Sequence, residues 1–485
     1  MSEGTTTIVI FGASGDLAKR KLVPALFTLA AKNRLDANVR IVGASRSTMS
    51  DDQFRESMWD ALQEFSDLKN RRHDWDRFAR RLHYIPADIS NPEHFLNMKE
   101  HLEELEGDAR PANRLFYLSI APSLYLPAIL NLGATDLALE DTGWRRVVIE
   151  KPFGWNLESA QALNREVHQV FKEEQVYRID HYLGKESVQN LLVLRFANAI
   201  FEPVWNRNYV DNIQITVAES VDVADRAAYY DESGVVRDMV QNHLLQLLAM
   251  VAMEPPSAAD AESLRSKKVD VLKAIRRWET DNVSNHAIRG QYEGYLDEKG
   301  VDPGSLTGTY VAMRLYVDNW RWRDVPFYLR TGKAMANKTS EIIVQFQSPP
   351  HLMFYDRKPD DLSPNVLSVC LQPNEGTHLR FQSKVPDQGM AMQPVDMEFS
   401  YETAFRDQSI PEAYELLLED ALQGDASLFI RSDHIEEAWR IVEPLLNWHE
   451  IRPPYQYDRG SWGPKAADWL LAQDGRSWVL VCGGS

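Results

Sequence analysis

The stretch "IVIFGASGDLAKRK" (Ile8–Lys21) joins a short β-branched run to the start of a helical pattern. Within it, Gly12, Gly15 and Ala18 have the spacing G-x-x-G-x-x-[GA], a variant of the dinucleotide-binding fingerprint. Gly12 would make the tight turn, Gly15 would let the backbone approach a pyrophosphate, and Ala18 would let the helix close on the sheet. The helix N-terminus would then face the phosphates. Glycine-rich turns between strand and helix also occur without a ligand, so this motif needs support from other segments.

Outward from this stretch, short β-branched runs alternate with helical patterns up to about residue 180. Strands are expected at residues 6–11, 39–45, 82–88, 114–121, 145–151 and 176–180. Helical periodicity occurs between them, at residues 22–35, 52–65 and 158–172. A strand–helix–strand rhythm of this kind predicts a parallel sheet with crossover helices, that is, a Rossmann-like domain.

Beyond about residue 205 the pattern changes to period-two alternation, with strands that follow one another through turn-like loops. The expected strands are residues 212–220, 309–317, 341–348, 365–373, 377–383 and 396–401. They predict a large, mainly antiparallel sheet with one solvated face, and we expect long helices beside it at residues 233–253 and 411–422. The predicted fold class is α/β plus α+β, with a Rossmann-like domain at residues 1–178 and a larger domain at 179–485.

Composition excludes several classes of partner. The 485 residues carry a formal net charge of −18, which disfavours nucleic acid or an acidic membrane surface. No stretch approaches the roughly 20 apolar residues that a membrane span needs, and the N-terminus lacks a basic signal-peptide start. Cys370 and Cys482 form neither a disulfide framework nor a metal-ligand spacing, so we expect two reduced thiols in a cytoplasmic protein.

The end of the second expected strand predicts which dinucleotide binds. A site that prefers NAD usually places a carboxylate there to hold the ribose 2′-hydroxyl, whereas this strand ends "GASRS", with Ser45 and Arg46. A guanidinium pairs with a 2′-phosphate that a carboxylate would repel. We therefore predict NADP, with NAD as a weaker alternative, while a solvated surface arginine remains the alternative interpretation of Arg46.

Two further strand ends carry candidates for chemistry. "VVIEKPFG" (Val147–Gly154) places Lys151 just past a strand, where open α/β sheets bind ligands, and a cis bond before the proline is compatible with the sequence. "RIDHYLGKESVQN" places Asp180 at the end of the next strand. If a helix begins at or just after His181, that residue and Lys185 lie on one helical face and anchor a phosphate together with the free N–H groups.

A second polar strip, "RDMVQNHLLQ", contains Asp238 and His243. Residues five apart on an α-helix point about 140° away from each other, so these two side chains are predicted to be poor partners. His243 then needs an orienting carboxylate from another segment, and Asp180 is the obvious candidate. A histidine has an unperturbed pKa near ~6.5, which suits it to take a proton from a hydroxyl group.

The chain resembles the glucose-6-phosphate dehydrogenase family. The resemblance rests on motifs that occur in order along nearly the whole chain: "GASGDLAKRKL", "EKPFG", "RIDHYLGKE", "DMVQNH", "RWRDVPFYLRTGK" and "GSWGP". It implies an NADP-binding domain at residues 1–178, a substrate and oligomerisation domain at 179–485, and a homodimer or homotetramer. Where the family usually has glycine in "RAGYYD", this chain has Ala228. We expect no second, structural NADP site near the C-terminus.

The resemblance also implies roles for individual residues. His243 would be the catalytic base and Asp180 would stabilise its charged form. The residues implied to bind substrate are Lys151, His181, Tyr182, Lys185, Glu219, Asp238, Lys333 and Lys338. The residues implied to bind the cofactor are Gly12, Ala13, Ser14, Gly15, Asp16, Leu17, Arg46, Asp88 and Lys151.

The implied reaction is oxidation of D-glucose 6-phosphate at C1 to 6-phospho-D-glucono-1,5-lactone, with hydride transfer to NADP⁺ as the first step of the oxidative pentose phosphate pathway. It needs no metal, because an imidazole removes the proton and a nicotinamide accepts the hydride. Two alternatives remain open. One is another Rossmann-type sugar oxidoreductase with an unphosphorylated substrate, and the other is a catalytically inactive NADP-binding regulator.

Overall fold

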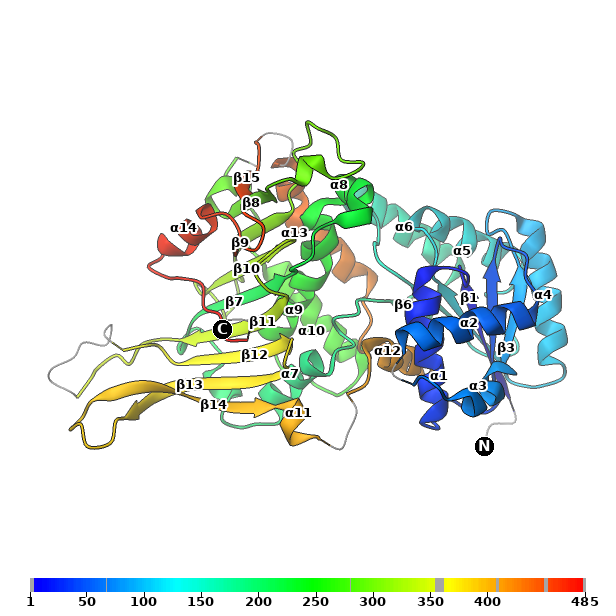
Figure 1. Ribbon diagram of the computed structural model, residues 1–485, viewed down its shortest axis with the longest axis horizontal. Helices are drawn as coiled ribbons and strands as arrows, with labels where there is room; N and C mark the ends of the chain where they lie inside the picture. Colours follow the sequence, from blue (N-terminus) through cyan, green and yellow to red (C-terminus); the bar gives the residue numbers. More distant parts are fainter. Residues whose placement is uncertain are drawn as a thin grey trace. The chain divides into compact units, whose positions relative to one another are not determined.

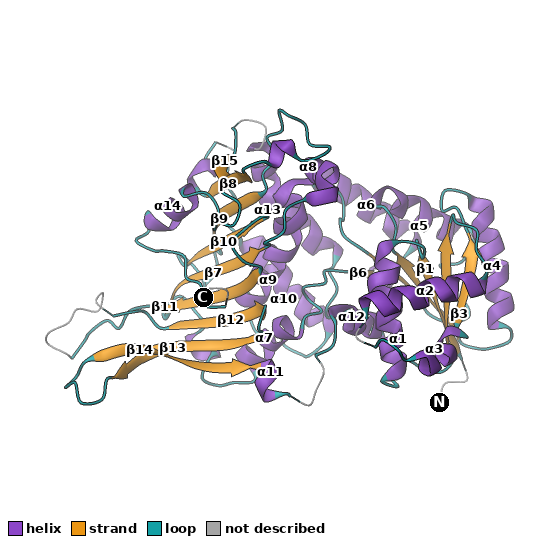
Figure 2. Ribbon diagram, viewed as in Figure 1, coloured by secondary structure: helices purple, strands orange, loops and turns teal. Residues whose placement is uncertain are grey.

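The computed structural model describes residues 4–66, 68–279, 281–353, 362–406, 410–448 and 452–482. They form two compact units (Figures 1 and 2). The first unit contains the chain up to Gly184 together with Ala258–Arg265 and Pro411–Glu436. The second contains Lys185–Ser257, Ser266–Ile410 and the chain from Glu437 onward. Within the described ranges, every helix is too short or too polar to span a bilayer.

The first unit is built on a six-stranded sheet in the order β3-β2-β1-β4-β5-β6, in which all pairs are parallel. Its strands are β1 (Thr5–Phe11), β2 (Val39–Ser45), β3 (Leu82–Pro86), β4 (Ala112–Leu118), β5 (Arg145–Ile149) and β6 (Val176–Arg178). Its crossover helices are α1 (Val23–Ala31), α2 (Asp51–Phe65), α3 (Arg72–Ala79), α4 (Pro92–Glu106), α5 (Tyr125–Ala134) and α6 (Leu157–Val170). The predicted Rossmann-like domain is confirmed.

The register of this sheet aligns the carboxyl ends of its central strands. Phe11 at the end of β1 lies opposite Ala44 of β2 and Leu118 of β4. Ile149 at the end of β5 lies opposite both Leu118 and Arg178. Because the strands are parallel and end together, the residues that follow them emerge at one edge of the sheet.

Helix α12 (Ala413–Gln423) belongs to this first unit, although the sequence prediction placed it beside the second sheet. The prediction is wrong because an amphipathic pattern shows that a helix has an apolar face but not which element covers it. Here α12 contacts α1, and Lys32 of the following turn forms an ion pair of 2.6 Å with Glu415. Lys21 forms a second ion pair, of 2.8 Å, with Glu412 just before α12.

The second unit is built on a nine-stranded sheet in the order β14-β13-β12-β11-β7-β10-β9-β8-β15. Among the described strand pairs of this sheet, only β7–β10 and β8–β15 are parallel, so the predicted mainly antiparallel sheet is confirmed. Its strands are β7 (Val210–Ala218), β8 (Ala287–Tyr292), β9 (Tyr310–Tyr316), β10 (Pro326–Gly332), β11 (Thr339–Phe346), β12 (Val366–Gln372), β13 (Gly376–Lys384), β14 (Met392–Ser400) and β15 (Tyr455–Tyr457).

Helices accompany this sheet, and the helical stretch predicted at residues 233–253 is among them. They are α7 (Glu186–Phe196), α8 (Ala227–Val235), the π-helix η6 (Val236–Leu244), α9 (Leu245–Ala252), α11 (Tyr401–Ala404) and α14 (Ala466–Ala472). Helices α10 (Ala261–Ala274) and α13 (Ser432–Trp448) each contain a point where the chain passes from one unit to the other. The hairpin of β13 and β14 lies at one edge of the sheet (Figure 2), and most residues of β14 are exposed.

The C-terminal segment crosses the second sheet as an extended strap, which we define as residues 476–482. Arg476 forms two bonds, of 2.8 and 2.7 Å, with Asp211. Farther along, the backbone N–H groups of Val481 and Cys482 donate to the Glu341 carboxylate over 3.1 and 3.0 Å. Burial raises the pKa of Glu341, and these two N–H groups oppose that rise.

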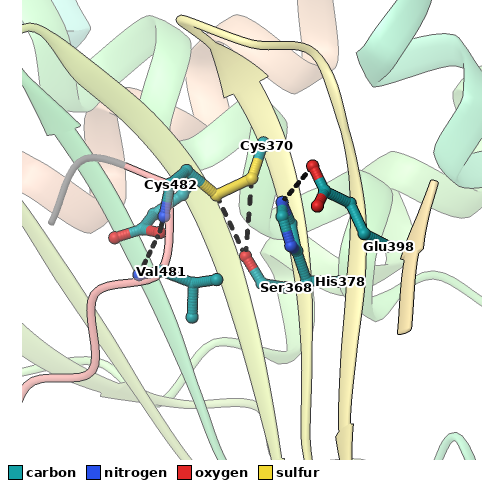
Figure 3. The surroundings of a disulfide bond; sticks show 7 residues. Ser368, Cys370, His378, Glu398, Val481 and Cys482 are labelled. Atoms are coloured by element: carbon teal, nitrogen blue, oxygen red, sulfur yellow. Dashed lines mark hydrogen bonds and ion pairs between the residues drawn. A yellow bond between two sulfur atoms is a disulfide. The ribbon is translucent and has the colours of Figure 1, made fainter. Parts of the chain in front are cut away.

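A disulfide bond joins the strap to β12 through Cys482 and Cys370 (Figure 3). The Cα atoms of the two cysteines lie 5.6 Å apart, and the Ser368 hydroxyl lies 3.1 Å from the Cys482 sulfur. The expectation of two reduced thiols is therefore wrong. It considered the number and spacing of cysteines, whereas the pairing depends on the strap returning across 112 residues of sequence to β12.

Cys482→Ser should lower the unfolding temperature of the second unit. Closing a loop of this size removes conformations from the unfolded chain, which typically stabilises a protein by ~2–4 kcal/mol. Thermal unfolding with and without a dithiol reductant checks this. With the reductant, the melting temperature of the wild type should fall to that of the variant, whereas the melting temperature of the variant should not change. A wild-type melting temperature that neither the reductant nor the substitution changes would contradict the stabilising role.

Candidate functional site

The glycine turn after β1 has the geometry that a dinucleotide cradle requires. Gly12 has φ +79°, and a Cβ atom there would lie 2.0 Å from the Ser119 carbonyl oxygen. The turn closes through the Gly15 N–H group, which donates to the Gly12 carbonyl over 2.9 Å, and helical structure begins at Asp16. Ala18 is fully buried, so the helix packs closely on the sheet. These residues therefore fit a bound pyrophosphate.

Arg46 follows β2 directly and is exposed at the same edge of the sheet. Asp88 lies two residues after β3, where Ser90 hydrogen bonds lower the pKa of its carboxyl group and the positive charge of Arg46 lowers it further. The structure thus places Arg46 and Asp88 on neighbouring strand ends. A positively charged group here would attract the 2′-phosphate of a coenzyme, as the sequence analysis predicted.

Lys151 follows β5 at a sharply defined corner. Its peptide bond to Pro152 is cis, as the sequence allowed. Gly154 closes the corner with φ +80°, and a Cβ atom there would lie 2.5 Å from the backbone nitrogen of Ala160. The start of α6 therefore packs directly against this turn and fixes the backbone that carries Lys151.

The sequence analysis assigned no role to Glu150, the residue before this lysine. Its carboxylate accepts a hydrogen bond of 2.6 Å from the Tyr117 hydroxyl group. Burial raises the pKa of Glu150, while hydrogen bonds from Tyr117 and Tyr414 and the nearby charge of Lys151 oppose the rise. Tyr414 lies in α12, so no local sequence pattern could have indicated this cluster.

Asp180 follows β6 at the same edge and is only 1 % exposed. Its carboxylate accepts a hydrogen bond of 3.0 Å from the Tyr182 N–H group, and its carbonyl accepts one of 3.0 Å from Leu183. The chain from His181 to Gly184 is a turn. The condition that a helix begins at or just after His181 is therefore not met, and the argument that His181 and Lys185 share a helical face is wrong.

Lys185 instead occupies the N-cap position of α7, which begins at Glu186. Its carbonyl accepts from the N–H groups of Val188 and Gln189, and its ammonium group donates to the Gln372 side chain over 2.9 Å. A lysine at a helix start adds a full positive charge to the partial positive charge of the helix dipole. This arrangement suits an anion without requiring a shared helical face.

Lys333 lies together with two other predicted substrate residues, Glu219 and Asp238, in the second unit. Its ammonium group forms an ion pair with Glu219 and lies 3.4 Å from a carboxylate oxygen of Asp238. It also lies 5.4 Å from the centre of the Tyr230 ring. Lys333 is 8 % exposed, so these charges are largely withdrawn from water. Lys338, another predicted substrate residue, is exposed just before β11.

The motif "GSWGP" supports the loop that carries Lys333. The Gly460 N–H group donates to Ala334 over 2.8 Å, and the Ala336 N–H group donates to Ser461 over 2.9 Å. Tyr457, which the sequence analysis did not single out, donates to the Lys333 carbonyl over 2.7 Å. The motif therefore has a structural reason, because it holds the backbone that directly follows this lysine.

His243 is 1 % exposed in the π-helix η6, which also carries Asp238. In a π-helix each N–H group bonds to the carbonyl five residues earlier, so residues five apart lie on the same side. The prediction that Asp238 and His243 point about 140° apart assumed the α-helical period of roughly 3.6 residues and is wrong. Single-turn π segments inside longer helices are frequent at functional sites.

The fold and these strand-end residues define a Rossmann-type oxidoreductase. A family model described as "Glucose-6-phosphate dehydrogenase, NAD binding domain" matches residues 9–190, and one described as "Glucose-6-phosphate dehydrogenase, C-terminal domain" matches residues 192–479. The chain belongs to the glucose-6-phosphate dehydrogenase family.

Individual proteins agree with this assignment. Glucose-6-phosphate 1-dehydrogenase of Aggregatibacter actinomycetemcomitans is 45 % identical, covering 97 % of this chain and 96 % of its own length. The Bacillus subtilis enzyme of that name is 42 % identical, covering 97 % of both. A glucose-6-phosphate dehydrogenase solved in complex with its substrate glucose-6-phosphate has a TM-score of 0.91 at 35 % identity, covering 98 % of this chain and 99 % of that one. The Mycobacterium avium enzyme has a TM-score of 0.86 at 38 % identity, covering 99 % of both.

Proposed function

We propose that this chain oxidises D-glucose 6-phosphate at C1 to 6-phospho-D-glucono-1,5-lactone, with NADP⁺ as the hydride acceptor. The observation that carries the proposal is the similarity, over nearly the whole chain, to the structure that contains glucose-6-phosphate. In this proposal residues 1–178 bind the coenzyme, while residues 179–485 bind the sugar and form the oligomer contacts. The nicotinamide supplies the hydride-accepting carbon, and the protein supplies binding, orientation and proton removal.

His243 removes the proton of the C1 hydroxyl group, and Asp180 stabilises the imidazolium that results. Both side chains are buried, and within its own unit each is held by a defined backbone, the turn after β6 for Asp180 and η6 for His243. A buried carboxylate favours a neighbouring imidazolium strongly, because little water screens the pair. General bases of this kind contribute roughly 10²–10⁴-fold to the rate.

The substrate phosphate is bound by Lys185 with His181 and Tyr182. Lys185 supports this role because it combines a side-chain cation with the N-terminus of α7. Glu219 and Asp238 accept hydrogen bonds from sugar hydroxyl groups, and Lys333 holds these two carboxylates in place. Lys151 and the more exposed Lys338 complete the set of residues that bind the substrate. Binding energy from the phosphate, remote from C1, then holds the sugar in a reactive position.

The coenzyme residues of the proposal are those at the carboxyl edge of the first sheet. The turn of Gly12, Ala13, Ser14, Gly15, Asp16 and Leu17 cradles the pyrophosphate, Ser14 and Arg46 bind the 2′-phosphate, and Asp88 lies on the adenosine side. We also propose a homodimer or homotetramer, which the exposed Met397 and Phe399 side chains of β14 support. We also propose a cytoplasmic location.

Lys185→Ala should selectively weaken binding of the phosphorylated substrate. In the wild type we expect kcat/KM for glucose 6-phosphate to exceed that for glucose by several orders of magnitude. In the variant, kcat/KM for glucose 6-phosphate should fall about 10²-fold because a charged hydrogen bond is lost, whereas kcat/KM for glucose should not change. NADPH absorbance with both sugars measures this, with the exposed Lys273→Ala as the charge-matched control. Similar wild-type kcat/KM values for both sugars would favour an oxidoreductase acting on unphosphorylated sugars. No turnover of either sugar would favour an inactive NADP-binding regulator.

Arg46→Ala should lower the ratio of kcat/KM for NADP⁺ to that for NAD⁺ by roughly 10–100-fold, because only NADP⁺ carries the 2′-phosphate. Initial rates with both coenzymes at saturating glucose 6-phosphate check this. Arg110→Ala is the control, since Arg110 is also exposed but precedes β4 at the opposite edge of the same sheet. An unchanged coenzyme ratio in Arg46→Ala would show that the 2′-phosphate is recognised elsewhere.

A further inference from the structure

A single buried tyrosine holds both neighbours of Arg46. Tyr84 lies in the middle of β3, the strand that pairs with β2, and is 5 % exposed. Its hydroxyl oxygen lies 2.6 Å from the Ser45 hydroxyl and 2.6 Å from the Ser47 carbonyl oxygen. One phenol group therefore bridges the residue before Arg46 and the residue after it.

The hydrogen-bonding capacities of these groups fix their directions. A carbonyl oxygen only accepts, so the Tyr84 hydroxyl donates its one proton to Ser47 and accepts from the Ser45 hydroxyl. The Ser45 carbonyl accepts from the Ala87 N–H group over 2.8 Å and lies 3.4 Å from the Tyr84 hydroxyl, farther than the Ser47 carbonyl does. The backbone on each side of Arg46 is thus tied to β3 or to the residue that follows β3.

The ring of Tyr84 is itself held in place. It packs against Phe54 of α2 with the ring centres 5.2 Å apart, and its N–H group donates to the Asp51 side chain over 2.8 Å. Asp51 is the first residue of α2, whose N-cap is Ser50. The loop from Ser45 to Ser50 is therefore fixed at its start by Tyr84 and at its end by the capped helix. Arg46 itself is exposed on this loop.

We infer that Tyr84 is a positioning residue for coenzyme selectivity, which acts by holding the Ser45–Ser47 backbone so that Arg46 faces the 2′-phosphate. The inference rests on the proposed use of NADP. Without the phenol hydroxyl, the Ser47 carbonyl loses its donor and the Ser45 hydroxyl loses its acceptor. The loop then gains freedom, and that freedom must be lost again when a 2′-phosphate binds. NAD⁺ lacks the 2′-phosphate that this ordering serves.

Tyr84→Phe tests the inference, because it removes one oxygen and keeps the ring that packs on Phe54. We expect kcat/KM for NADP⁺ to fall about 5–30-fold through KM, as for the loss of one or two hydrogen bonds, with kcat for NADP⁺ and kcat/KM for NAD⁺ changed less than about twofold. Ser45→Ala, which removes the other hydroxyl and leaves the ring untouched, should change the coenzyme ratio in the same direction. Circular dichroism and melting temperature confirm that both variants fold.

The double variant Arg46→Ala/Tyr84→Phe shows whether Tyr84 acts through Arg46. We expect the coenzyme ratio of the double variant to equal that of Arg46→Ala, because the tyrosine has nothing left to position. Equal losses toward both coenzymes in Tyr84→Phe would overturn the inference and leave Tyr84 a purely structural residue.

Comparison with Arg46→Ala separates this inference from the proposed function. If Arg46→Ala lowers the coenzyme ratio but Tyr84→Phe and Ser45→Ala do not, the inference fails and the proposed 2′-phosphate site stands. If none of the three variants changes the ratio, the assignment of the 2′-phosphate to Arg46 fails as well.

Discussion

The site depends on the parallel pairing of six strands in one sheet. Because β1, β2, β4, β5 and β6 run in the same direction and end in register, the residues that follow them emerge at one edge. Gly12, Arg46, Lys151 and Asp180, which are spread over more than a third of the chain, all follow such strand ends. A shift of any one strand along its neighbour would move its functional residue away from this edge, so the chemistry relies on the register of the sheet.

In the second unit, the corresponding constraint is local charge balance. A chain with a net charge of −18 must gather cations to bind an anionic sugar. Lys333 pairs with Glu219 and Asp238, and the "GSWGP" segment holds its loop. Lys185 places a further cation at the start of α7, where we propose that the substrate phosphate binds.

The alternation of strands and helices in the first unit, and the candidate residues at its strand ends, could be predicted from sequence, because they depend on short-range patterns such as the glycine spacing after β1. Three features could not. The π-helix at Asp238 and His243 leaves no clear mark in side-chain periodicity, and the partner of α12 is set by packing against α1. The Cys370–Cys482 bond depends on the path of the strap. Tyr84 and Glu150 were missed because their hydrogen-bonding partners come from distant segments. The division at residues 178 and 179 stays a prediction.

The central claim is that Asp180 and His243 act as one catalytic pair. A double-mutant cycle on kcat with glucose 6-phosphate tests it most directly, using Asp180→Asn, His243→Asn and the combination. We predict that His243→Asn alone lowers kcat by roughly 10²–10⁴-fold, and that adding Asp180→Asn changes kcat less than about threefold, because the carboxylate then has no imidazolium to stabilise. Independent, multiplicative losses from the two substitutions would contradict the account.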